Sequence, residues 1–95
     1  MTAHARHRAA ARRHLDLALS RAAPGSAVHA RIEHRLARAE LAAGHASVAR
    51  ERIAAALAEF RALADPAGEL AALDTEGDVL LALDDRPAAR SALEA

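Results

Sequence analysis

The chain has 95 residues, enough for one domain with a small core and too few for a second, and its thirteen arginines balance thirteen acidic residues. Alanine and leucine supply most of an apolar fraction of 53%, and Phe60 is the only aromatic residue, so the composition favours an all-α fold over a sheet. The absence of cysteine excludes disulfides and thiolate metal sites and fits a cytoplasmic protein, and no apolar stretch approaches the roughly 20 residues that span a bilayer.

Turn signals divide the sequence into helical segments. The turn residues are Pro24-Gly25-Ser26, Gly44, Asp65-Pro66 and the run 84–87. Gly44 suits the left-handed residue that ends a helix, and Asp65-Pro66 suits a helix start, because aspartate accepts a bond from a free amide and proline is tolerated at the first position. We therefore expect one helix over 3–23, two helices within 26–64, and a fourth helix with the start of a fifth within 66–95 of a single domain.

Apolar residues recur three or four positions apart within each segment, the spacing of an amphipathic helix with one buried face. The segment after Gly44 shows this pattern best, at Ala49, Ile53, Ala56, Phe60 and Leu63. We expect Ile53, Leu57 and Phe60 to lie at the centre of the core.

The sequence also repeats at a longer period. A shift of 40 residues superposes Leu41 on Leu81, Ala49 on Ala89 and Ile53 on Leu93, and such a period indicates stacked helix pairs. The same shift superposes Ala37 on Gly77. We expect these two small residues to lie where the helices of a pair cross closely.

The unit that begins at residue 66 resembles a tetratricopeptide repeat. The matching positions are Leu73, Gly77, Leu80, Asp85, Ala89 and Leu93. The period of 40 exceeds the usual 34 of that family, and in this respect the chain is similar to the long-period arrays of actinobacterial transcription activators, the antibiotic-regulatory and large LuxR-type regulators. The preceding unit departs from the pattern at Glu33 and Glu40, where the family has large apolar residues. We expect their neighbours Ile32 and Leu41 to take these places through a slight rotation of the helix.

The resemblance implies an α-solenoid of antiparallel helix pairs, right-handed, with about two repeats after an orphan helix over 3–23. Such arrays hold a protein or peptide partner in a concave groove that is lined by the first helix of each pair. Carried over by position, the groove comprises Arg31, His34, Arg38, Leu41 and Ala42 from one unit and Ala71, Asp74, Asp78, Leu81 and Ala82 from the next. The resemblance therefore implies a protein-interaction scaffold in a transcription-regulatory setting.

The charges of this groove fall into two stripes. Arg31, His34 and Arg38 are spaced at i, i+3 and i+7 and share one helix face, while Asp74 and Asp78 share another at i and i+4. A peptide could present an acidic group to the first stripe and a basic group to the second, because the planar fork of arginine suits carboxylate or phosphate. Alternatively, the two stripes pair with each other or are simply solvated.

The sequence contains no constellation typical of catalysis. Its serines lie near expected helix ends or at exposed positions, and it has no glycine-rich phosphate loop. His4, His7 and His14 share one helical stripe, but the neighbouring arginines repel a cation and no carboxylate completes a ligand set. We expect neither an enzyme nor a metal or cofactor site.

The first helix offers an alternative function. Arg6, Arg8, Arg12 and Arg13 could neutralise phosphates of a nucleic acid, although the chain has no aromatic residues for base stacking and no net charge. Nucleic-acid binding is therefore the second hypothesis.

Charge is distributed unevenly along the chain. Residues 1–38 hold eight arginines and two acids, whereas residues 39–95 hold five arginines and eleven acids. Leucines near residues 80–83 and Leu93 would also lie uncovered at the end of an array, which needs polar caps. We expect either a homodimer, with the basic first helix against the acidic end of a second copy, or a longer protein that supplies a cap.

Overall fold

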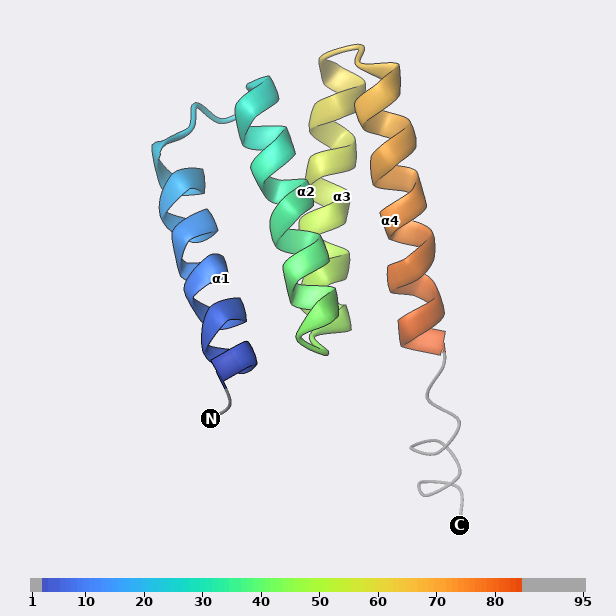
Figure 1. Cartoon of the computed structure of the whole chain (residues 1–95). Helices are drawn as coiled ribbons and strands as arrows, with labels where there is room; N and C mark the ends of the chain where they lie inside the picture. The colour runs from blue at the N-terminus through green and yellow to red at the C-terminus, as the bar shows by residue number, and fades with distance from the viewer. Residues whose placement is uncertain (1–2, 85–95) are drawn as a thin grey trace.

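The computed structural model describes residues 3–84, and within that range the chain forms four α-helices and no strand. They are α1 (Ala3–Arg21), α2 (Ala27–Ala42), α3 (Ala46–Ala62) and α4 (Pro66–Asp84) (Figure 1). The prediction of an all-α fold is confirmed. The start of a fifth helix, predicted near the end of 66–95, lies outside the described residues.

The helix ends form where the turn residues predicted them. The Ser26 side chain accepts a hydrogen bond from the His29 amide at 3.1 Å and caps α2, and Asp65 caps α4 by accepting from the Gly68 amide at 3.0 Å. Gly44 has a φ of +85° directly after α2, in the left-handed region that glycine adopts without a steric cost. Local interactions therefore set the start of α2, the end of α2 and the start of α4.

Consecutive helices run in opposite directions and pack in chain order (Figure 1). α2 and α3 form the central pair, α4 packs on α3 and touches α2, and α1 packs mainly on α2. The loop before α2 is tied to α3 by Glu59, which accepts a hydrogen bond from the Gly25 amide at 2.8 Å and lies 2.7 Å from His29 Nδ1. α1 and α4 therefore lie at opposite edges of the array.

The core lies between α2, α3 and α4, and α3 contributes its largest share. Ile53, Leu57 and Phe60 are 0%, 5% and 2% exposed, which confirms their predicted central position. They pack with small residues, Ala30 and Ala37 of α2 and Ala72 of α4 among them. By contrast, α1 has no fully buried residue among those whose side chains are described.

Helices α3 and α4 approach each other closely at Gly68 of α4. A Cβ atom built there would overlap the ring of Phe60, so the first turn of α4 lies directly on that ring. Gly77, the crossing residue that the repeat predicts, has open space where a Cβ would lie, and the helix that would cross it falls outside the described residues. Ala37, which the 40-residue shift superposes on Gly77, is fully buried.

One expectation drawn from the resemblance is wrong. Glu33 does not turn outward in favour of Ile32: Glu33 is 6% exposed, while Ile32 is only partly buried. Glu40 is likewise half-buried. Both carboxylates stay on the packed side of α2 because arginines from other helices pair with them, as described below.

Candidate functional site

The basic stripe of α2 is centred on a histidine that joins three helices. His34 Nε2 lies 2.7 Å from the Thr75 hydroxyl of α4, and the imidazole meets the Phe60 ring of α3 edge-on, at 6.4 Å between ring centres. Burial of the imidazole, and secondarily the nearby positive charge of Arg38, lower the pKa of His34 below its usual value. Both effects favour the neutral imidazole over its protonated form at the junction between the two stripes.

The charged members of the stripes lie on either side of this junction. Arg31 and Arg38 are exposed on α2, and Asp74 and Asp78 are exposed on α4. None of the four has an ion-pair partner within residues 3–84, so the predicted pairing of the two stripes with each other does not occur. The structure leaves both sets of charges open to water or to a partner.

The apolar members of the predicted groove differ in their exposure. Leu41 on α2 is partly buried, whereas Leu81 on α4 is 69% exposed. A depression of about 620 Å³ lies further up α4, lined by Ala67, Leu70, Ala71, Leu73 and Asp74. We use the name partner surface for the seven predicted site residues, Arg31, His34, Arg38 and Leu41 of α2 with Asp74, Asp78 and Leu81 of α4.

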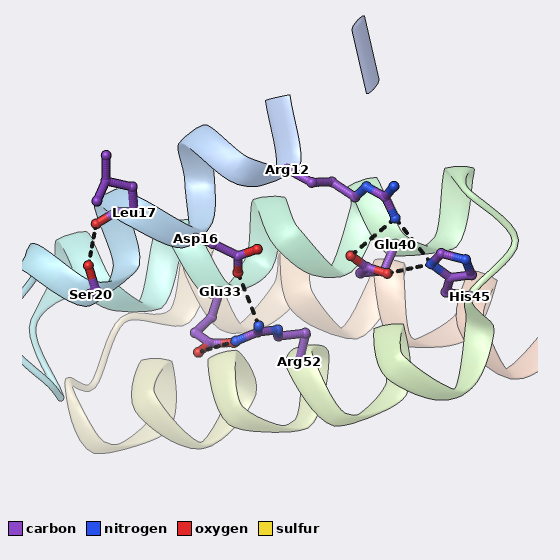
Figure 2. Close-up of polar contacts among 8 residues, drawn as sticks. All are labelled: Arg12, Asp16, Leu17, Ser20, Glu33, Glu40, His45 and Arg52. Carbon is purple, nitrogen blue, oxygen red and sulfur yellow. Dashed lines mark hydrogen bonds and ion pairs between the residues drawn. The ribbon is translucent and has the colours of Figure 1, made fainter. Parts of the chain in front are cut away.

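A polar network that the sequence did not reveal joins α1 to the central pair (Figure 2). Arg52 of α3 donates to Glu33 of α2 at 3.3 Å and to Asp16 of α1 at 3.2 Å. The second oxygen of Glu33 is buried and has no hydrogen-bond partner in the structure. A single guanidinium thus bridges two carboxylates from two different helices.

A second network lies near the end of α2 (Figure 2). Glu40 lies 2.8 Å from His45 Nδ1 and 3.6 Å from the guanidinium of Arg12, so the charge of Arg12 faces inward. Of the four arginines behind the nucleic-acid hypothesis, Arg12 is therefore engaged within the protein. Arg6, Arg8 and Arg13 are exposed.

The histidine stripe of α1 gathers no further ligands. His7 and His14 are exposed, and the side chain of His4 is not among those described. Across residues 3–84, no three histidine or acidic side chains lie close enough together to hold a metal ion.

The sequence did not predict several of these contacts. Thr75, the partner of His34, carried no signal beyond its place on the buried side of α4. Glu33 and Glu40, in contrast, are visible in the sequence as two acids seven residues apart on a helix face that should be apolar. Acidic side chains in such a position indicate that basic side chains are buried beside them. The bases that answer them, Arg52 and Arg12, come from other helices and could not be assigned by spacing.

The comparisons with known proteins give no relative. The chain matches no family model, no curated protein and no solved structure. Within the part of the chain that the structure describes, no helix is both long and apolar enough to cross a membrane.

Proposed function

We propose that this chain is a protein-interaction scaffold, a tetratricopeptide-like α-solenoid that binds a peptide or protein segment on the partner surface. The setting implied by the resemblance is transcription regulation in the cytoplasm. The ligand is a segment with an acidic group for Arg31 and Arg38 and a basic group for Asp74 and Asp78. The chain itself carries out no reaction in this proposal.

One observation supports the proposal more than any other. Arg31 and Arg38 are exposed in register on one face of α2, without an ion-pair partner in the described range, on a helix that also contacts α4. The acids of the adjoining helix α4 are equally open, and the His34–Thr75 hydrogen bond fixes the spacing of the two helices between them. Segregated charges on a rigid support favour electrostatic recognition of a ligand.

A random peptide library displayed on phage tests this proposal directly. The wild-type chain should select peptides that carry both an acidic and a basic residue. The double variant Arg31→Glu/Arg38→Glu should lose at least tenfold in affinity for the selected peptides, the equivalent of about 1.4 kcal/mol, and should keep its helical circular dichroism. It should also favour peptides in which the acidic group is replaced by a basic one.

The matched control is Arg8→Glu/Arg50→Glu. Both residues are exposed and without an ion-pair partner among the described residues, on α1 and α3, and the change in net charge is the same. This control should bind the selected peptides as the wild type does. Equal losses in the two double variants would show that net charge, and not the partner surface, governs binding.

The nucleic-acid hypothesis predicts the reverse pattern. Exposed arginines of α1 would then carry the contact, so Arg8→Glu/Arg50→Glu would weaken DNA or RNA binding and Arg31→Glu/Arg38→Glu would not. Because Arg12 is paired with Glu40, three arginines of the predicted set remain for phosphates. Gel-shift assays at low and high salt with both variants distinguish the two functions.

A further inference from the structure

α4 presents a row of leucines that no described residue covers. Leu70 and Leu81 are 71% and 69% exposed, and they lie eleven residues apart on the side of α4 that faces away from α3. Leu73 and Leu80 are 38% and 44% exposed and lie at the border of the same face. We name these four residues, together with Asp74, the α4 edge.

The charge of α4 points to what this face would accept. The helix has five acidic residues, Asp74 and Asp78 among them, and no basic one. A bare apolar face with acidic neighbours suits a helix that is apolar along one line and basic beside it. Such a helix is present in this same chain.

α1 has that character along its exposed residues. Exposed residues recur at intervals of three and four along α1 and form one stripe, at Arg6, Ala10, Arg13, Leu17 and Arg21. Leu17 and Arg21 also line a depression that they share with Val28 and Ile32 of α2. Leu17 is 49% exposed within the stripe, and the three arginines have no ion-pair partner among residues 3–84. We name this stripe the α1 edge.

We propose that the α1 edge of one copy packs on the α4 edge of a second copy, with Leu17 seated among the leucines and Arg13 beside Asp74. Helices α1 and α4 lie on opposite sides of the molecule (Figure 1), so the contact is head-to-tail and each copy keeps one free edge. A heterologous contact of this kind continues from copy to copy. The α4 edge shares Asp74 and Leu81 with the partner surface, whereas the α1 edge, Leu70, Leu73 and Leu80 lie outside it, so the two proposals are tested with different variants.

The strength of the contact follows from its size. Each copy contributes a single helix, so the buried area falls at the low end for protein interfaces, below about 1,200 Å², where complexes are weak and transient. Opposite charges beside the leucines make the association sensitive to salt. Self-association should therefore appear at high protein concentration and decrease as salt is added.

Two variants with one defective edge each test the arrangement. Arg13→Glu/Leu17→Glu places acids on the α1 edge, opposite the acids of α4, and Leu70→Gln/Leu73→Gln removes the apolar contact from the α4 edge. Sedimentation equilibrium should show that the wild-type mass rises with concentration above the 9.9 kDa of one chain, whereas each variant stays at that mass. An equimolar mixture of the two should form a complex of two chains and nothing larger, because one intact pair of edges remains.

Two controls locate the effect. Val48→Gln alters an exposed apolar residue of α3 away from both edges, and Arg31→Glu/Arg38→Glu alters the partner surface; both should self-associate as the wild type does. Arg31→Glu/Arg38→Glu leaves both edges intact, so it should weaken peptide binding without weakening self-association. Failure of the peptide-binding proposal can therefore be distinguished from failure of this one.

A wild-type mass of one chain at every concentration would overturn the inference. A mixture in which both variants remain single chains would overturn the head-to-tail arrangement.

Discussion

Gly68 and Gly77 are two glycines of one helix in opposite surroundings. A methyl group at position 68 overlaps the Phe60 ring, which is itself packed in the core, whereas position 77 has open space. Gly68→Ala should therefore lower the free energy of unfolding by roughly 1–3 kcal/mol, the usual cost of overpacking. Gly77→Ala should raise it by about 0.5–1 kcal/mol, because alanine favours the helix interior.

Urea unfolding followed by circular dichroism measures both changes, and each variant serves as the control for the other. Changes of the same sign would contradict the packing described for the first turn of α4. Phe60→Leu in the Gly68→Ala background should recover part of the loss, since a smaller, flexible side chain can make room for the methyl group.

The two glycines also show what the sequence can and cannot predict at the residue scale. The repeat pattern singled out Gly77, because a period in the sequence relates residues that occupy equivalent positions. It gave no weight to Gly68, whose role depends on a ring eight residues away across a turn. In contrast, the core position of Phe60 followed from its helical spacing alone, because apolar periodicity reports directly which face is buried.

Ion pairs, as well as partly buried apolar side chains, attach α1 to the central pair of helices. α1 has no fully buried residue among its described side chains, and its contacts with the central pair include the bridges through Arg52 and Arg12. Arg52→Met should leave the buried carboxylate of Glu33 without its counter-charge and lower the free energy of unfolding by roughly 1–3 kcal/mol. Hydrogen exchange should show the largest relative loss of protection in α1, because Asp16 loses its partner as well.

The double variant Glu33→Leu/Arg52→Met distinguishes the effect of the buried charge on stability from the effect of side-chain packing. It should recover most of the loss, since an apolar pair of similar size removes the unpaired carboxylate. Asp16→Asn is the matched control, because its exposed carboxylate pairs with the same arginine at the surface and should contribute less than about 1 kcal/mol. If the double variant loses as much free energy of unfolding as Arg52→Met does, then lost packing, and not the unpaired charge, causes the destabilisation.

At the scale of helices, the sequence predicted the elements better than their attachments. Gly44 and Asp65 marked helix ends correctly because capping is a local interaction between residues close in sequence. The contacts of Arg52 with Glu33 and Asp16 span 19 and 36 residues, so no local pattern predicts them. For the same reason the groove could be placed only through a resemblance, and the partner of His34 could not be named.

The described part of the molecule is thin, with principal extents of 47, 31 and 17 Å, so few contacts join its helices to one another. His34 lies at one of these contacts, with Thr75 of α4 and Phe60 of α3 around it. Burial, and then the charge of Arg38, depress the pKa of His34 in the folded state. As the pH falls, His34 therefore takes up a proton at a higher pH in the unfolded chain than in the folded protein.

The stabilising contribution of neutral His34 is complete above its unfolded pKa of about 6.5 and is lost as the pH falls through the folded-state pKa. The wild type should consequently lose more unfolding free energy below pH 6.5 than His34→Gln, which keeps a donor near Thr75 and cannot titrate. Arg38→Gln should make this loss of unfolding free energy smaller, because it removes one of the two causes of the lowered pKa of His34. Urea unfolding at several pH values below 7 measures the free energy of unfolding of each protein. A difference between wild type and His34→Gln that stays constant with pH would contradict the prediction.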